Sequence, residues 1–326
     1  MGLFDFLLKK KTKPTVSVSI SNNDYSATEQ IVKLYNDYNP NKKYTLPRNE
    51  NYATAAFLRH CQNGKPVGSS LKEYPDYLSR KYKINDPIKY HKCLIDNGFL
   101  VEASLPVLLK KYKISEIQDI LKSKNIIEKG KKEVLIQKVC ENFSIDELNL
   151  TKIYIPTEKG IEHLNKFNFI FTLEYLGINP DNYDTFVKLN KLSPLPNDRI
   201  WALINCHYMY YSVGKYYGLA RNEVLNMAKL LSSENKNKDA LYYYINVLYY
   251  DTSGLNNSGT VSKKESVLLA PGIVSEICQL KEYFDVDMVR KCYEQSLPHH
   301  YLSIQSFNKL IEDILEDKVI DINNYC

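Results

Sequence analysis

Residues 114–142 constrain the fold more than any other part of the chain, because ISEIQDILKSKNIIEKGKKEVLIQKVCEN contains two helical periods separated by turn residues. The apolar residues that recur at the spacing of one helix face are Ile117, Ile120 and Leu121, followed by Leu135, Ile136 and Val139. Between the two sets, Asn125 and Gly130 accept a left-handed backbone at little cost. Ser115, with Gln118 three residues later, has the pattern of a capping box. The stretch therefore predicts two short helices joined by a tight turn.

Positive charge is concentrated in the same stretch. Between Leu109 and Lys138 there are nine lysines and four acidic residues, a balance of +5, and the whole chain of 326 residues also carries +5. The remaining residues therefore sum to zero. We expect the second helix to begin near Lys132, where free amide groups and the positive end of the helix dipole already favour an anion. This distribution is the electrostatic footprint of a nucleic-acid contact.

The hairpin resembles the SAP domain, a helix–turn–helix-like DNA-binding module. Residues 114–121 are similar to the first helix of that family, and Ile126 stands at its apolar turn position. Residues 130–136, GKKEVLI, resemble its Gly-Lys-Lys-x-x-Leu-Ile signature. The chain departs from the family at Asn125, where glycine is usual, and at residues 137–138, where Gln-Lys replaces a common Glu-Arg.

In the SAP family, DNA contact falls at the turn and at the start of the second helix. The DNA-binding residues that the resemblance implies here are Lys122, Lys124, Lys129, Gly130, Lys131, Lys132 and Lys138. Two alternatives stay open: the lysines form only a solvated face, or the hairpin docks on a protein. Because the hairpin has no arginine, bidentate guanine readout is not expected there. Double-stranded DNA, preferred through groove shape when AT-rich, is the expected partner.

The flanking segments predict a small α+β scaffold. An Asp-Pro pair at residues 86–87 is a helix start and Gly98 is a helix stop. Residues 99–103 and 152–155 are strand candidates, and residues 157–164 resemble the segment that follows the wing in winged-helix proteins. We therefore expect the SAP-like hairpin to be inserted in the wing of a winged-helix-like scaffold whose two strands pair. The alternative is a simpler α+β scaffold that only presents the hairpin.

Residues 168–326 are expected to form an all-α domain. An Asn-Asp pair at residues 197–198 caps one predicted helix, and a pair of helices is predicted over residues 223–232 and 238–250. Within that pair, the residues at spacings resembling one tetratricopeptide (TPR) repeat are Ala228, Leu231, Ala240, Tyr244 and Val247. We expect the tyrosine run at 242–250 to form core and groove lining.

The predicted fold is therefore mainly α. Residues 1–50 are expected to be a basic leader and polar linker, with one short strand at 16–20. Residues 51–167 are expected to form the winged-helix-like scaffold containing the SAP-like module at 109–143. The TPR-like C-terminal domain follows.

The amino-terminal sequence and the cysteines bear on location. Met1 to Lys11 places its apolar residues before its lysines, the reverse of a signal peptide. A basic leader is expected there, and a membrane or partner anchor is the alternative. Seven scattered cysteines without a C-x-x-C pair favour reduced thiols and a cytoplasmic protein. No run of residues reaches the length of a membrane span.

The sequence gives no sign of catalytic chemistry. The His and Cys neighbours that invite a metal interpretation are His60-Cys61, His91 with Cys93, and Cys206-His207, and none has zinc-ligand spacing. Phosphate-loop, dinucleotide and nucleophile-elbow motifs are missing from the sequence. We expect no metal, no cofactor, no small-molecule substrate and no enzymatic activity.

Two functions remain. The first is a non-catalytic DNA-binding protein whose residues 168–326 bind a protein partner or self-associate. The second is a protein-interaction adaptor that uses the TPR-like groove without touching DNA. The arrangement resembles SAP-domain-containing proteins of low-GC Gram-positive bacteria and their phages.

Overall fold

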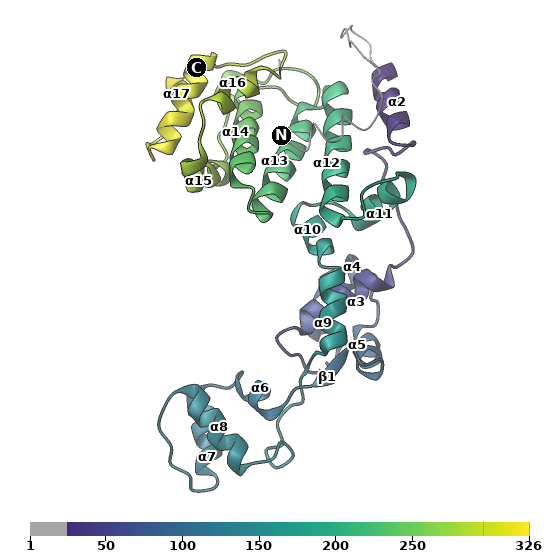
Figure 1. Cartoon of the computed structure of the whole chain (residues 1–326), viewed down its shortest axis with the longest axis vertical. Coiled ribbons are helices and arrows are strands. Elements are labelled where there is room, and N and C mark those ends of the chain that lie inside the picture. Colours follow the sequence, from purple (N-terminus) through teal and green to yellow (C-terminus); the bar gives the residue numbers. More distant parts are fainter. Residues whose placement is uncertain (1–24, 296, 326) are drawn as a thin grey trace. The chain divides into compact units, whose positions relative to one another are not determined.

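The computed structural model describes residues 25–295 and 297–325 (Figure 1). The expected strand at 16–20 and the basic leader lie outside the described residues. The described part is mainly helical and contains one two-stranded sheet, which confirms the predicted class. It divides into two compact units. The hairpin unit comprises residues 44–182, and the helical unit combines residues 183–326 with the segment that ends at Lys43.

These boundaries differ from the expected ones at both ends. The expected linker contains helix α2 (Tyr25–Leu34), which packs against α12 (Pro196–Val213) of the helical unit. Helix α10 (Phe169–Tyr175), expected in the C-terminal domain, instead places Ile170 in the core of the hairpin unit. Both differences arise from contacts between residues that are distant in the chain, which composition does not report.

The hairpin unit is built from short helices around one small sheet. In chain order its elements are α3 (Glu50–Cys61), η1 (Leu71–Glu73), α4 (Asp76–Arg80), α5 (Pro87–Asp96), β1 (Leu100–Glu102), α6 (Leu105–Leu109), α7 (Ile114–Lys122), α8 (Lys132–Asn142), β2 (Tyr154–Pro156), α9 (Glu158–Lys166) and α10. Helix α11 (Pro180–Leu189) contains the boundary between the units. The predicted start of α5 is confirmed, because Asp86 accepts a hydrogen bond from the Lys89 amide at 2.9 Å.

The two strands flank the hairpin in sequence and pair with each other. β1 and β2 are antiparallel, with Leu100 opposite Pro156 and Glu102 opposite Tyr154. The predicted pairing is therefore confirmed. Helices α6, α7 and α8 all lie between these strands in the chain, so the lysine-rich hairpin is an insertion and not an appended module.

A close approach joins α9 to the start of β1. Gly160 lies in the first turn of α9, and a Cβ built on it would lie 2.4 Å from the backbone oxygen of Phe99. That oxygen also accepts a hydrogen bond from the Thr157 amide at 3.0 Å. Only glycine therefore permits this spacing between helix and strand.

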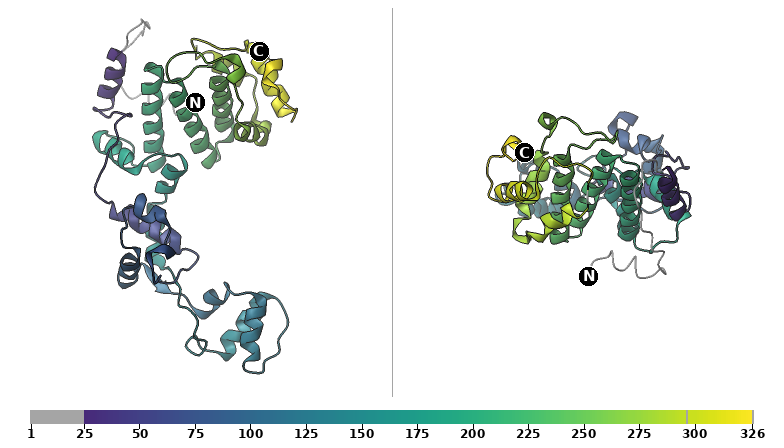
Figure 2. Two further views of the ribbon diagram at one scale, coloured as in Figure 1. Left: turned by 180° about the vertical axis from the view of Figure 1, so that it is seen from behind. Right: turned by 90° about the horizontal axis from the view of Figure 1, so that it is seen from above.

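The hairpin has its own apolar core. Buried residues from α6, α7 and α8 meet there, and they are Leu105, Leu109, Ile117, Leu121, Leu135, Ile136, Val139 and Phe143. Figures 1 and 2 show α7 and α8 side by side. A smaller cluster of Ala103, Leu108 and Ile153 joins the ends of the insertion to the strands. All six residues of the predicted apolar faces are buried or half-buried.

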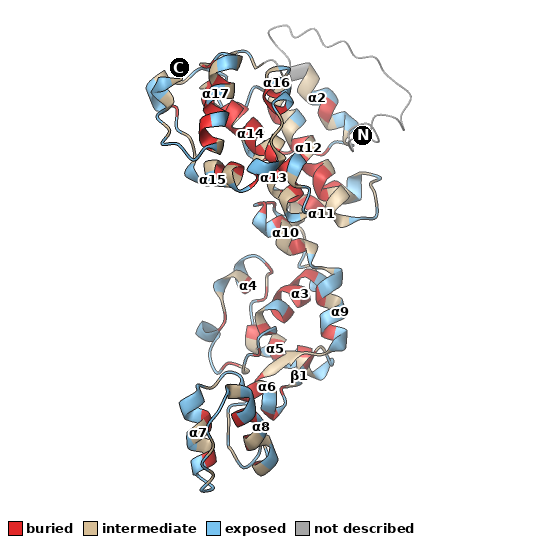
Figure 3. Ribbon diagram, turned by 60° about the vertical axis from the view of Figure 1, so that its left-hand side comes forward, coloured by how far each residue is buried: buried red, intermediate tan, exposed pale blue. Residues whose placement is uncertain are grey.

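The helical unit contains three long helices followed by shorter ones. The elements after α12 are α13 (Tyr217–Ser233), α14 (Asn237–Ser253), η2 (Lys264–Ser266), α15 (Pro271–Gln279), η3 (Lys281–Tyr283), α16 (Asp287–Tyr293), α17 (Ile304–Leu315) and η4 (Ile322–Asn324). Helices α13 and α14 pack closely, and their buried faces are red in Figure 3. Small Ala228 and Ala240 are fully buried and Tyr244 is 2% exposed, as expected for two helices in close contact.

Helix α12 begins earlier than predicted. Its first residue is Pro196 and its N-cap is Leu195, so Asn197 and Asp198 lie inside the first turn and do not cap it. Proline at the first helical position is favoured because its missing N–H has no intrahelical partner there.

A buried polar network holds the amino-terminal segment on the helical unit. Tyr38 is fully buried, and its hydroxyl lies 3.1 Å from Nε2 of His207. The other ring nitrogen of His207 lies 3.3 Å from Glu223, which also accepts a hydrogen bond from Asn226. The polar groups of this interior therefore satisfy one another, as buried polar groups must.

Candidate nucleic-acid interface

The turn between α7 and α8 spans residues 123–131, so it is longer than the tight turn that the sequence predicted, and of the two residues expected to be left-handed only Asn125 is. Asn125 has a left-handed φ of 60°, and Gly130 has a φ of 157°, which side chains rarely permit. The amide of Ile126 donates to the carbonyl of Leu121 at 3.0 Å, which closes the end of α7. Helix α8 begins at Lys132, as predicted.

The start of α7 differs from the prediction. The N-cap is Lys113. The backbone amide of Lys113 donates a hydrogen bond to Oε2 of Glu116 at 2.5 Å. Ser115 lies inside the helix, so the expected capping pair with Gln118 is wrong. The carboxylate of Glu116 is a stronger acceptor for a helix amide than the Gln118 amide oxygen, and the N-cap accordingly lies two residues earlier than predicted.

Two of the seven predicted contact residues are exposed lysines that pair with no other described residue. Lys129 and Lys131 project from the turn, and within the described residues their ammonium groups make no hydrogen bond or ion pair. Gly130 lies between them and sets the backbone. No side chain caps the N-terminus of α8 at Lys131, so the first amides of that helix also lack a side-chain acceptor.

Two other predicted lysines hold the hairpin together. The ammonium of Lys124 donates to the backbone oxygen of Asn142 at 2.6 Å and lies 4.2 Å above the ring of Phe143. The ammonium of Lys132 donates to the backbone oxygen of Lys110 at 2.7 Å. Both ammonium groups therefore stabilise the hairpin by hydrogen bonds to distant backbone oxygens.

Lys122 and Lys138 form ion pairs within their own helices. Lys122 lies 2.8 Å from Asp119, and Lys138 lies 3.3 Å from Glu141. The side chains are 65% and 40% exposed. Exposed pairs of this kind contribute little to stability, so neither lysine is needed to hold the hairpin together.

Two lysines outside the predicted set join the exposed group. The bond from Lys132 places the backbone of Lys110 beside the start of α8. Lys110 and Lys113 are exposed, and their ammonium groups have no hydrogen-bonding partner in the part of the chain that the structure describes. The charge excess between Leu109 and Lys138 includes both lysines. The charge count therefore indicated these two positions as candidate contacts, whereas the SAP-like signature at residues 130–136 did not.

Of the metal candidates of the sequence, Cys61, His91, Cys206 and His207 are buried, whereas His60 is half-buried and Cys93 is exposed. Sγ of Cys61 lies 3.9 Å from Nε2 of His91, and the hydroxyl of Tyr74 lies 3.0 Å from its Nδ1. Burial lowers the pKa of His91 to about 4 and raises the pKa of Cys61 to about 12. Both are therefore neutral near pH 7, and a thiolate nucleophile is not formed. Residues 25–295 and 297–325 contain no group of three or more potential metal ligands.

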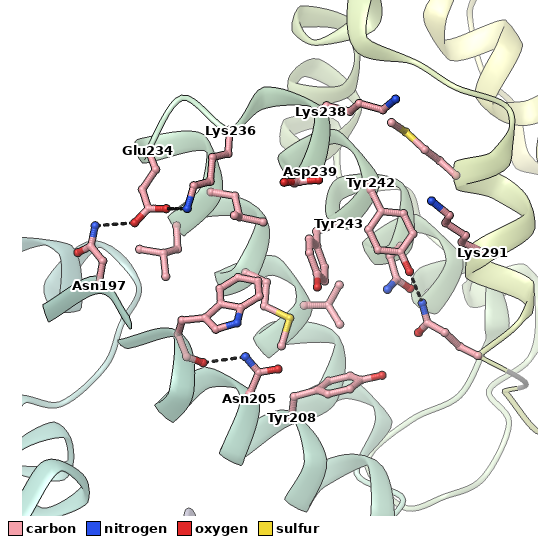
Figure 4. Close-up of a pocket in the computed structure, with 18 of the residues that line it drawn as sticks. Asn197, Asn205, Tyr208, Glu234, Lys236, Lys238, Asp239, Tyr242, Tyr243 and Lys291 are labelled. Atoms are coloured by element: carbon pink, nitrogen blue, oxygen red, sulfur yellow. Dashed lines mark hydrogen bonds and ion pairs between the residues drawn. The ribbon is translucent and has the colours of Figure 1, made fainter. Parts of the chain in front are cut away.

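The helical unit carries a groove of about 900 Å³. It lies among α12, α13, α14 and α16, and Figure 4 shows Tyr208, Tyr242 and Tyr243 around it. Trp201, two methionines, Val224, Leu230 and Leu231 also contribute to its apolar lining. The predicted groove-lining role of the tyrosine run is thus confirmed for Tyr242 and Tyr243, while Tyr244, Tyr249 and Tyr250 are buried in the core.

Comparison with known proteins adds no identity: no family model, curated protein or solved structure matches the chain. Across the described residues, none of the helices has the length and apolar character needed for a membrane crossing.

Proposed function

We propose that this chain is a non-catalytic DNA-binding protein that contacts duplex phosphates through the SAP-like hairpin. In this proposal the scaffold is winged-helix-like, with α5 preceding the wing and the hairpin inserted between its strands. The TPR-like helical unit binds a protein partner or self-associates.

The observation that carries the proposal is the group of exposed lysines without internal partners around the start of α8. Lys110, Lys113, Lys129 and Lys131 form this group, and we name it the lysine cluster. An unpaired ammonium group beside uncapped helix amides is suited to a phosphate oxygen. Because phosphate contacts carry no base information, affinity is expected to depend on salt more than on sequence.

The lysine cluster and the paired lysines allow a charge-matched test. Lys129→Ala with Lys131→Ala removes two unpaired ammonium groups, and Lys122→Ala with Lys138→Ala removes two paired ones. Each lost phosphate contact lowers the slope of log K against log salt by about 0.9. The first variant should therefore lose about two units of slope and bind unrelated duplexes about 30-fold more weakly at 0.15 M salt. The second should change far less.

Fluorescence anisotropy with labelled random and AT-rich duplexes would measure both variants beside the unmodified chain. Circular dichroism would check that each remains folded. Unchanged binding by the variant lacking Lys129 and Lys131 would exclude the turn as the contact.

The second candidate function is the adaptor, and the groove of the helical unit favours it. In that case the lysine cluster binds acidic side chains of a protein. The adaptor would be favoured if micromolar protein gave no salt-sensitive shift with any duplex.

A further inference from the structure

The groove of the helical unit contains two hydrogen-bond acceptors that no other described residue satisfies. Asn246 is 2% exposed and lines the groove, and its Oδ1 has no hydrogen-bond partner within the described residues. Gln295 also lines the groove, and its Oε1 is likewise buried without a partner. Leaving a buried acceptor unpaired is costly, and such groups often mark functional positions.

The two acceptors lie beside the same aromatic side chain. The amide nitrogen of Gln295 donates to the hydroxyl of Tyr242 at 3.1 Å. Tyr242 and Asn246 are four residues apart on α14, so they share one face of that helix with Tyr243. The wall of the groove thus contains two unpaired carbonyl oxygens next to aromatic rings, and neighbouring atoms cover both oxygens.

The aromatic side chains of this wall are uncharged and pack edge to face. The ring centroids of Trp201 and Tyr243 are 5.8 Å apart with their planes at 79°. Burial raises the pKa of Tyr242 to about 12 and also raises the pKa of Tyr243. Both phenols are therefore uncharged near pH 7, and their faces can accept a cation.

The charges around the groove leave an acidic excess. Its lining includes five carboxylates and three lysines. Lys236 pairs with Glu234 at 2.6 Å, and Lys238 pairs with Asp285 at 3.4 Å. Asp239 is exposed and has no ion pair in the described part of the chain. A ligand that complements this lining carries positive charge and hydrogen-bond donors.

We propose that the groove binds an extended segment of a partner protein through an arginine side chain. The guanidinium group has five donors in one plane and stacks on aromatic faces. Its planar face can lie against the ring of Tyr242, and it can donate to the oxygens of Asn246 and Gln295 once the side chains that cover them move aside. The carboxylate of Asp239 adds long-range attraction. This inference rests on the part of the proposed function that assigns partner binding to the helical unit.

The chain provides its own reporter for the test. Trp201 is the only tryptophan in the sequence and it lines the groove. The probe is the peptide Ser-Gly-Ser-Arg-Ser-Gly-Ser, titrated into the full-length chain while tryptophan emission is followed. The matched peptide carries citrulline, which has nearly the same shape without the charge. We expect a saturable change with arginine, roughly millimolar in affinity, and binding about tenfold weaker with citrulline.

Two substitutions separate a binding role from a structural one. Asn246→Leu removes a buried acceptor without a partner, so it should weaken arginine binding about tenfold while the urea midpoint stays the same or rises. A structural role would lower the midpoint and leave the peptide affinity unchanged. Asp239→Asn should weaken binding by a smaller factor, and Glu265→Gln, an exposed carboxylate that is not part of the groove lining, should not.

Three results of the titration would overturn the inference. They are no saturable change with the arginine peptide, equal binding of the arginine and citrulline peptides, and tighter binding of the peptide in which glutamate replaces the arginine. Dimer formation that excludes the peptide would assign the groove to a second copy of the chain and would also overturn it. The titration contains no DNA, so its failure would leave duplex binding by the hairpin untouched.

Discussion

Replacing Gly160 by alanine should destabilise the hairpin unit at one defined contact. The added Cβ would lie 2.4 Å from the Phe99 backbone oxygen, whereas such contacts are essentially never shorter than 3.0 Å. Helix α9 and the start of β1 must therefore separate by at least about 0.6 Å, the difference between these two distances. Backbone cannot rotate aside as a side chain can, so the helix itself must move.

The expected cost follows from two opposing effects. Overpacking of this kind costs about 1–3 kcal/mol, and the separation also weakens the hydrogen bond from the Thr157 amide to the same oxygen. Alanine recovers up to about 1 kcal/mol through its higher helix propensity. The net loss of stability should be about 1–2 kcal/mol.

Hydrogen exchange measured by mass spectrometry would report this loss of stability separately for each helix. A loss of 1–2 kcal/mol should speed exchange of the slowest amides of α3 and α9 about 5- to 30-fold. The control is Gly272→Ala in α15, whose added Cβ meets nothing within 4 Å. Unchanged or slower exchange in α9 of the Gly160 variant would refute the close approach.

Three further predictions concern single side chains. Asn125→Ala should destabilise the hairpin by about 1 kcal/mol because Asn125 has a left-handed backbone, whereas Asn125→Gly should not, and thermal melts compare them. Tyr38→Phe should cost about 1–2 kcal/mol in urea unfolding followed by tryptophan emission, because it removes the buried hydroxyl beside Nε2 of His207. Hydrogen bonds from Lys318, Lys309 and Tyr325 lower the pKa of Asp313. The hydrogen bonds by which Asp313 holds Lys318 and Tyr325 of the C-terminal segment are therefore present above about pH 4 and are lost as the pH falls further. Carboxypeptidase digestion should accordingly be faster at neutral pH in Asp313→Asn than in the unmodified chain.

The local patterns of the sequence predicted the hairpin well. Apolar spacing placed both faces in the core, and Lys132 begins the second helix. Gly98 ends α5 with a φ of 70°, as expected of a helix stop. These features depend on residues close together in the chain, so a single sequence is sufficient to predict them.

Contacts between distant residues were beyond the sequence patterns. Nothing near Tyr38 indicates that it would be buried against His207, 169 positions away. Cys61 and His91 belong to separate His-Cys motifs in the sequence, and their proximity depends on how α3 and α5 pack. The division of the lysines also depends on the fold, since Lys124 and Lys132 bind backbone carbonyls that only the closed hairpin brings near.

The central claim is phosphate contact by the lysine cluster, and the salt dependence of duplex binding tests it most directly. Anisotropy of a labelled duplex would be measured with the unmodified chain at 50 mM and 200 mM salt. Four phosphate contacts predict a slope of about −3.6 and a loss of affinity of roughly 100-fold between these concentrations, nearly the same for random and AT-rich duplexes. Absence of binding at micromolar protein, or affinity independent of salt, would contradict the account.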